Sequence, residues 1–234
     1  MNKQSNTYTI IYIIVLVVVV GAALAFTAMT LRPLQQENAD VDKMKQILAS
    51  VGVVPDDGKV SDEFNKYIVE SFVVNAKGQR VDGNAFDVNV EKMSKESDSS
   101  KRELPVYVCD LKGERKYILP VYGAGLWGPI WGYVSINSDG TTVYGAYFAH
   151  QGETPGLGAE IEKPEFSNQF KGKRLWIDGK FQPIEVVKAG QKPANGADYV
   201  DGVSGGTITS KGVGAMLDNC LAPYKTYLET LRTK

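Results

Sequence analysis

The chain begins with a long, unbroken apolar segment. Residues 10–29 carry no charged side chain, and their number matches the roughly 20 apolar residues that a helix needs to cross the hydrocarbon core of a membrane. Ala23-Leu24-Ala25 would also suit cleavage of a signal peptide, but only Lys3 precedes the apolar run, which continues past that site. The pattern favours an uncleaved membrane anchor over residues 1–32, with Pro33 ending the helix.

The charges that flank this segment predict its orientation. Lys3 and the α-amino group precede the segment, and Arg32 follows it. The positive-inside rule counts lysine and arginine, so the balance slightly favours an N-terminus in the cytoplasm. We therefore expect a single-pass protein of the bacterial inner membrane, with residues 33–234 forming one domain on the periplasmic side.

The centre of the chain has the pattern of a β-sheet. Four runs are rich in β-branched and aromatic residues and are separated by Gly, Asn and Asp. The runs are 104–109, 117–122, 130–136 and 142–149. Asp139-Gly140 predicts a hairpin between the last two runs, and two shorter strands are expected at 174–177 and 184–187. Glycines 123, 125, 128 and 132 interrupt the second and third runs, which indicates bulges or the close approach of another group.

Helical patterns flank this central region. Asn38 is a candidate N-cap for a helix that continues to about Val51, whereas residues 56–103 are polar and weakly patterned, with a solvated loop at 94–101. Apolar residues with helical spacing predict a C-terminal helix over 213–231, which Pro223 should kink or split. The predicted fold class is α+β: a transmembrane helix, then a single mixed domain with a central, mainly antiparallel sheet.

Composition excludes several functions. The chain has 26 Lys and Arg against 27 Asp and Glu, so nothing indicates the basic face that nucleic acid requires. His150 is the single histidine, which excludes a multi-histidine metal site within one chain. The two cysteines, Cys109 and Cys220, lie far apart without a CxxC motif, so no metal site or redox dithiol is predicted. Whether these two cysteines pair stays open, although Cys220 lies on the apolar face of its helix, where it is best interpreted as a small buried hydrophobe.

Two glycine-rich loops are the best candidates for chemistry. Residues 150–158 read HQGETPGLG after a predicted strand, and residues 201–210 read DGVSGGTITS before the last helix. A glycine-rich turn that runs into a helix presents backbone N–H groups and the positive end of the helix dipole, which suits phosphate. The second loop lacks the GK[ST] of a Walker A loop and the GxGxxG of a dinucleotide fold. An ordinary helix N-cap remains the alternative on spacing alone.

The second loop also resembles a known modification site. Residues 204–210, SGGTITS, resemble the SGATxTS flavinylation motif, whose last threonine carries FMN through a phosphoester bond. The first loop resembles the partner motif HxETPGLG. With GLWGP at 125–129 and the N-terminal anchor, the chain resembles the family of the C subunit of the sodium-translocating NADH:quinone reductase. It departs from the family at Gly206, usually Ala, which should loosen the loop without blocking modification.

The resemblance implies a role for each matching residue. Thr209 is the expected acceptor of covalent FMN, added by a flavin transferase that uses FAD, so this chain need not activate the hydroxyl itself. The residues expected to hold the phosphate and to be recognised by the transferase are Asp201, Ser204, Gly205, Gly206 and Thr207. Those expected to line the isoalloxazine ring are Glu153, Thr154, Gly156, Leu157 and Gly158.

Three further residues are interpreted less specifically. Trp127 and Trp131 are candidates for stacking on the ring, although large aromatics in strands are more often core residues. His150 is interpreted as a structural hydrogen-bonding residue at a strand end.

The resemblance implies electron relay as the function. It predicts a subunit, active only within its complex, that carries electrons from an iron–sulfur centre toward another FMN in a membrane subunit while the complex oxidises NADH, reduces ubiquinone and exports sodium. The flavin subunit of the related Rnf ferredoxin:NAD reductase shares both loops, but GLWGP favours the quinone reductase. An anchored binding or scaffold module without flavin is the remaining alternative.

Overall fold

A long helix opens the structure, a computed structural model that describes residues 6–56 and 58–233. This helix, α1 (Asn6–Ala49), is long and apolar enough to cross a membrane, and it is the only such helix in the described residues. The chain divides between Lys43 and Met44 into two compact units, so the last turns of α1 belong with the domain that follows. The predicted boundary between the membrane anchor (residues 1–32) and the domain (residues 33–234) remains a prediction.

The expectation that Pro33 ends the first helix is wrong. Helix α1 continues through Pro33 and past Asn38, which is therefore not an N-cap. Proline removes one backbone hydrogen bond, but the residues that follow it, Leu34 to Glu37, are good helix formers. The Gln36 Nε2 group also donates to Asp40 Oδ1 at 2.9 Å, an i to i+4 contact that supports the helix beyond the proline.

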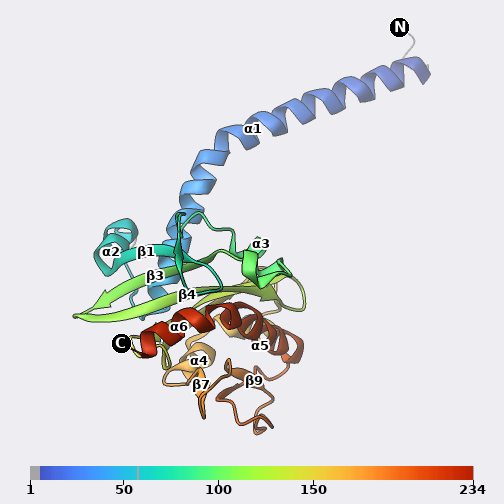
Figure 1. Ribbon diagram of the computed structural model, residues 1–234. Helices are drawn as coiled ribbons and strands as arrows, with labels where there is room; N and C mark the ends of the chain where they lie inside the picture. The colour runs from blue at the N-terminus through green and yellow to red at the C-terminus, as the bar shows by residue number, and fades with distance from the viewer. Residues whose placement is uncertain (1–5, 57, 234) are drawn as a thin grey trace. The chain divides into compact units, whose positions relative to one another are not determined.

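A six-stranded antiparallel sheet forms the centre of the second unit (Figure 1). Its strand order is β2-β1-β3-β4-β5-β6, and every neighbouring pair is antiparallel. The strands are β1 (Ile68–Val74), β2 (Arg80–Val81), β3 (Leu104–Leu111), β4 (Glu114–Ala124), β5 (Pro129–Asn137) and β6 (Val143–His150). The sheet and its helices confirm the α+β class, and the four predicted central strands correspond to β3 to β6.

The polar region 56–103 holds more structure than its pattern indicates. It contains α2 (Val60–Tyr67), strands β1 and β2, α3 (Val90–Lys95) and the 3₁₀ turn η1 (Ser99–Lys101). Strand β1 pairs with β3 from Ile68 to Val74, so it completes a sheet whose other strands lie later in the sequence. Asn89 caps α3, because its Oδ1 accepts from the Lys92 N–H at 2.8 Å.

The predicted hairpin joins β5 to β6. Gly140 adopts a φ of +62°, and the Asp139 carboxylate accepts from the Thr141 and Thr142 N–H groups, each at 2.8 Å. The glycine takes the left-handed conformation that this turn needs, and the aspartate holds the returning strand. Elsewhere in the hairpin, a β-carbon at Gly132 would collide with the Tyr147 carbonyl on β6, so the predicted close approach is confirmed there.

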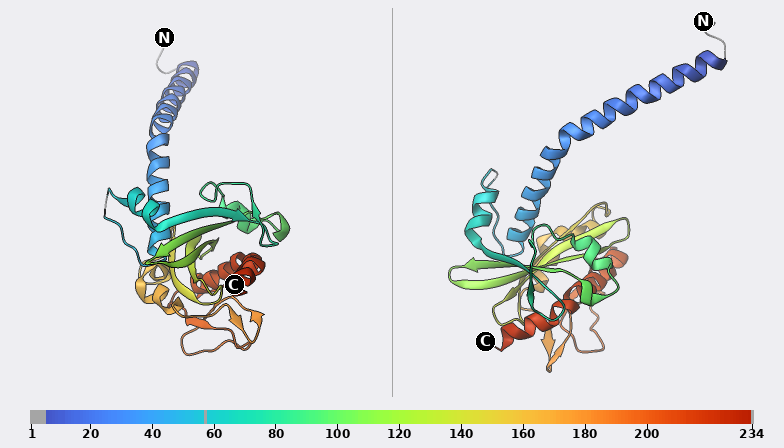
Figure 2. Two further views of the ribbon diagram at one scale, coloured as in Figure 1. Left: turned by 60° about the vertical axis from the view of Figure 1, so that its left-hand side comes forward. Right: turned by 45° about the horizontal axis from the view of Figure 1, so that its top comes forward.

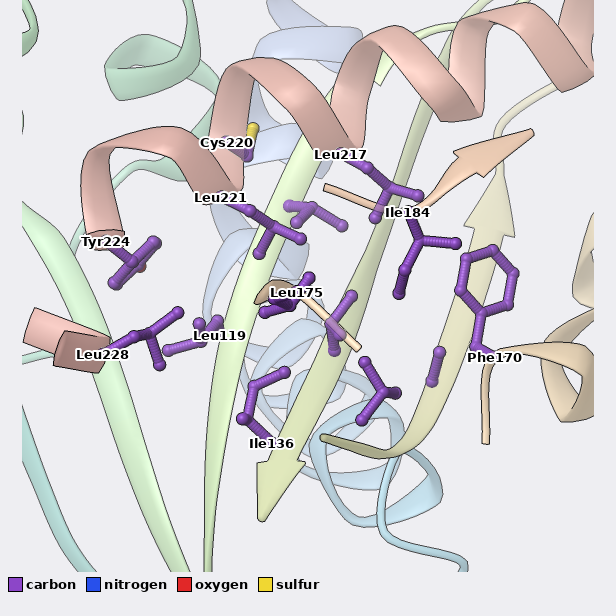
Figure 3. Close-up of a cluster of buried hydrophobic side chains, with 14 of the residues drawn as sticks. Leu119, Ile136, Phe170, Leu175, Ile184, Leu217, Cys220, Leu221, Tyr224 and Leu228 are labelled. Atoms are coloured by element: carbon purple, nitrogen blue, oxygen red, sulfur yellow. The ribbon is translucent and has the colours of Figure 1, made fainter. Parts of the chain in front are cut away.

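Apolar side chains cover both faces of the sheet. On β3, Val106 and Val108 join one core, whereas Tyr107 and Cys109 join the other on the opposite face. Figure 3 shows part of the first core, where Leu217 and Leu221 point toward the sheet strands. The second core contains Ile47 from the end of α1. Both cysteines are free, and Cys220 belongs to the first core, so the sheet separates it from Cys109.

The C-terminal helix is split as predicted. It forms α5 (Thr207–Leu221), the 3₁₀ turn η4 (Ala222–Tyr224) that contains Pro223, and α6 (Lys225–Arg232). Both helices lie along one face of the sheet (Figures 1 and 2), with α5 against β4. The remaining elements are η2 (Gly158–Glu162), α4 (Pro164–Ser167), η3 (Asn168–Phe170), β7 (Trp176–Ile177), β8 (Lys180–Phe181), β9 (Glu185–Val187) and β10 (Tyr199–Asp201).

Candidate functional site

A hydrogen bond between buried side chains joins the two glycine-rich loops. The first loop follows β6 and leads into η2, and the second follows β10 and leads into α5, which packs against η2. Thr209 Oγ1 donates to Glu153 Oε2 at 2.5 Å. The two residues are 56 positions apart and both are buried, with 1% of Thr209 and 4% of Glu153 exposed. Folding therefore brings together the two motifs that the sequence singles out.

Neighbouring residues hold both the carboxylate and the backbone of Glu153 in place. Its Oε1 accepts from the Trp127 N–H at 2.8 Å, and the Glu153 N–H donates to His150 Nδ1 at 3.1 Å. Burial raises the pKa of Glu153, but hydrogen bonds from Thr209 and from the Trp127 and Leu126 backbone outweigh it and hold the pKa below its ordinary value. Glu153 is therefore a buried, ionised carboxylate at neutral pH.

Two glycines make room for this carboxylate. A β-carbon at Gly125 would lie 2.5 Å from Glu153 Oε1. A β-carbon at Gly158 would collide with both Glu153 Oε2 and Thr209 Oγ1. Gly125 lies in GLWGP and Gly158 ends the first loop, so both motifs contribute glycines that accommodate the acid.

Helix α5 begins earlier than its apolar pattern predicts. It starts at Thr207, so Thr209 lies within the first turn, where backbone N–H groups lack helical acceptors. Gly206 occupies the N-cap position, and among the described residues no side chain caps this helix. Ser210 Oγ instead accepts from the Val203 N–H at 2.9 Å, which holds the preceding turn against the helix. This end of α5 therefore retains donors and a dipole that favour an anion.

Three of the residues predicted to hold phosphate line a cavity beside this turn. Ser204, Gly205 and Thr207 contribute to its walls, with Lys211 and the segment 186–189. Its volume is about 310 Å³, at the lower end of the range for small-molecule pockets. Lys211 also lines a neighbouring cavity of about 520 Å³ and brings positive charge to both. Asp201 is exposed at the end of β10, where its N–H donates to Gln169 Oε1 at 2.9 Å.

The predicted ring-lining residues occupy several different positions in the first loop. Thr154 shapes the turn, because its carbonyl accepts from the Leu157 and Ala159 N–H groups at 3.1 Å. Gly156 takes a φ of +76° and donates to Glu160 Oε1 at 3.0 Å. Leu157 is 43% exposed and packs closely over Gly205, so it connects the two loops.

The interpretation of Trp127 as a core residue is wrong. Trp127 lies in the connection between β4 and β5, where 69% of it is exposed and its backbone N–H donates to Glu153 Oε1. Trp131 lies in β5, is partly buried, and donates from Nε1 to Gln46 Oε1 at 2.9 Å. Four large apolar side chains are exposed on the segments that hold the Glu153–Thr209 pair: Leu126, Trp127, Leu157 and Ile208. Exposed apolar surface beside a buried hydroxyl suits a flat aromatic ligand.

His150 has the structural role that the sequence predicts. Its Nδ1 accepts the Glu153 N–H, and its Nε2 lies 3.7 Å from Glu162 Oε2. The direct bond between Glu153 and Thr209 is the feature that sequence reasoning did not anticipate. The residue types indicated a site in each loop, but nothing in the local pattern indicates which atoms meet across 56 positions.

Comparison with known proteins identifies the family of the region that contains the two loops. A family model described as "FMN-binding domain" matches residues 125–222, which include both loops. The C subunit of the Na(+)-translocating NADH-quinone reductase of Vibrio anguillarum is 36% identical over 228 residues, covering 91% of this chain and 89% of that protein.

Two solved structures have the same fold. The C subunit of the same reductase from Parabacteroides distasonis matches with a TM-score of 0.79 and 50% identity, covering 85% of this chain and 96% of that one. NqrC of Shewanella oneidensis matches with a TM-score of 0.68 and 26% identity, covering 84% of this chain and 100% of that one. The fold, the FMN-binding domain and the identity over most of both chains show that this protein belongs to the NqrC family, the C subunits of Na(+)-translocating NADH-quinone reductases.

Proposed function

We propose that this chain is a membrane-anchored electron-transfer subunit that carries FMN covalently on Thr209. The observation that best supports the proposal is the Glu153–Thr209 hydrogen bond, which joins the flavinylation-like loop to its partner loop at the first turn of α5. Thr207 is the competing acceptor, because its hydroxyl lies two residues away and it is exposed. Thr209 is favoured by the motif resemblance and by its position against the partner loop.

The residues present fit an FMN group. The first turn of α5 offers N–H donors and a favourable dipole to a phosphodiester, and Lys211 adds a positive charge to the cavity that Ser204, Gly205 and Thr207 line. Exposed Leu157 and Trp127 flank the pair and suit the apolar ring. The flavin supplies the electron-carrying chemistry when bound, and this chain supplies attachment, position and local electrostatics.

The family places this chain in a larger assembly. Its relatives are named as subunits of an NADH-quinone reductase that translocates Na⁺, which favours that complex over the Rnf complex. We propose that its partners are the iron–sulfur and FMN-bearing membrane subunits of that complex, with a flavin transferase needed for maturation. Helix α1 would anchor the chain in the inner membrane, with the flavin domain on the periplasmic side.

In-gel fluorescence tests the covalent bond. The full chain is expressed with and without a flavin transferase, denatured, and examined under ultraviolet light. We expect fluorescence only with the transferase, its loss in Thr209→Ala and its retention in Thr207→Ala. Peptide mass spectrometry then locates the flavin, and FMN on Thr207 or Ser210 in the unmutated protein would refute the assignment to Thr209. Absence of covalent flavin in every case would favour the scaffold alternative.

Protease accessibility tests the topology. Protease added to intact spheroplasts should digest residues that follow α1, because the proposal places them outside the cytoplasm. Digestion confined to inverted vesicles would reverse the orientation.

A further inference from the structure

The Thr209 hydroxyl is already paired with a base from its own chain. Glu153 Oε2 accepts a hydrogen bond from Thr209 Oγ1 at 2.5 Å, in a site from which water is nearly excluded. The resemblance implies that this chain need not activate Thr209 itself, but it does not exclude that it does. The geometry therefore assigns Glu153 a task that differs from lining the flavin ring.

We propose that Glu153 is the general base for the attachment of FMN to Thr209, an inference that rests on the proposed function. Thr209 Oγ1 forms a bond to the flavin-side phosphorus of FAD, and the bond from that phosphorus to the bridging oxygen breaks. AMP leaves with the bond's electron pair, and the hydroxyl proton passes to Glu153 Oε2. No atom is oxidised or reduced.

The anchoring of Glu153 suits this step. The Trp127 N–H holds Oε1, which leaves Oε2 directed at the hydroxyl, so the acceptor is in place before reaction. His150 is not an alternative base in this arrangement. Its Nδ1 accepts the Glu153 N–H, and its Nε2 faces Glu162.

The hydroxyl is covered until the loop segment over it moves. Thr209 is buried, and Gly158 lies directly against its Oγ1, so a flavin phosphate can reach this atom only when residues 157–158 separate from α5. The bonds that anchor Glu153 run to Trp127 and His150, which lie outside that segment. The base can therefore stay in place while the nucleophile becomes accessible.

The product also favours proton transfer to Glu153. The new phosphodiester carries a negative charge where the Thr209 hydroxyl was, and an ionised carboxylate beside it would be repelled. A protonated Glu153 is neutral and can donate a hydrogen bond to a phosphodiester oxygen. The accepted proton therefore removes a like-charge conflict that the modification would otherwise create.

Single-turnover flavinylation of the full chain tests the proposal. Purified transferase in excess and FAD are mixed with the unmodified protein, and covalent flavin is measured against time. Glu153→Gln keeps the shape of the side chain but not its basicity, whereas Glu153→Asp keeps the carboxylate on a shorter stem. If Glu153 is the general base, Glu153→Gln should be flavinylated about a hundredfold or more slowly than the unmutated chain, and Glu153→Asp faster than Glu153→Gln. A packing role predicts the opposite order.

A matched control and a second measurement complete the test. Glu160→Gln alters a carboxylate of η2 that contacts Gly156 rather than Thr209, and its rate should stay within about twofold of the unmutated rate. If Glu153→Gln does not fold, the same rate is measured for Glu153→Ala with added formate or chloride. Formate supplies a carboxylate and should restore flavinylation, whereas chloride should not. A wild-type rate in Glu153→Gln, Gln faster than Asp, or no rescue by formate would overturn the proposal. If the unmutated chain gains no flavin, the proposed function fails instead.

Discussion

Replacing Thr209 by Ala should destabilise the unmodified protein through Glu153. The mutation removes a buried hydrogen bond to a charged acceptor, which typically contributes about 1.5–3 kcal/mol. Alanine has the better helix propensity, which offsets this by up to about 0.7 kcal/mol. We therefore expect a net loss of about 1–2 kcal/mol, equivalent to a fall in Tm of roughly 2–8 °C for a chain of this size.

Thermal unfolding of protein made without the transferase measures this effect. Thr207→Ala is the matched control, because Thr207 is exposed in the same helical turn, and its Tm should barely change. Thr209→Ser keeps the donor and should recover most of the lost stability. The double variant with Glu153→Gln should lose less than the sum of the two single variants, since both remove one interaction. An equal Tm for Thr209→Ala and Thr207→Ala would refute the argument that this hydrogen bond is stabilising.

Three further predictions concern the same site. Folding lowers the pKa of Glu153, so the ionised carboxylate stabilises the folded protein above the ordinary pKa of 4.5, and this stabilisation is lost as the pH falls below that value. The Tm difference between the unmutated chain and Glu153→Gln should therefore shrink on acidification. Gly158→Ala should lower the free energy of unfolding by about 1–3 kcal/mol, because the new β-carbon would displace Glu153 and Thr209. Gly152→Ala is the control: a β-carbon there would meet open space, so thermal unfolding should change little. Leu157→Asp should leave covalent FMN detectable on a denaturing gel but change the flavin spectrum of the folded protein, because a carboxylate is costly against an apolar ring. An unchanged spectrum would show that Leu157 is not part of the ring site.

Local sequence was sufficient for much of the fold. The strands from Leu104 to His150 were predictable because β-branched and aromatic runs alternate with strong turn residues, and both properties act over a few positions. The split of the last helix was predictable for the same reason, since Pro223 cannot donate the backbone hydrogen bond that a continuous helix needs. The residue types in each loop likewise indicated a site.

Tertiary structure decided the rest. Strand β1 became recognisable only through its pairing with β3. Trp127 is exposed because it lies in the connection between β4 and β5 and not in a strand, which its aromatic character does not reveal. The sequence alone determined that Glu153 and Thr209 lie in two candidate loops. Only packing of η2 against α5 determined that their oxygens meet, because a hydrogen bond depends on positions in space and not on separation along the chain.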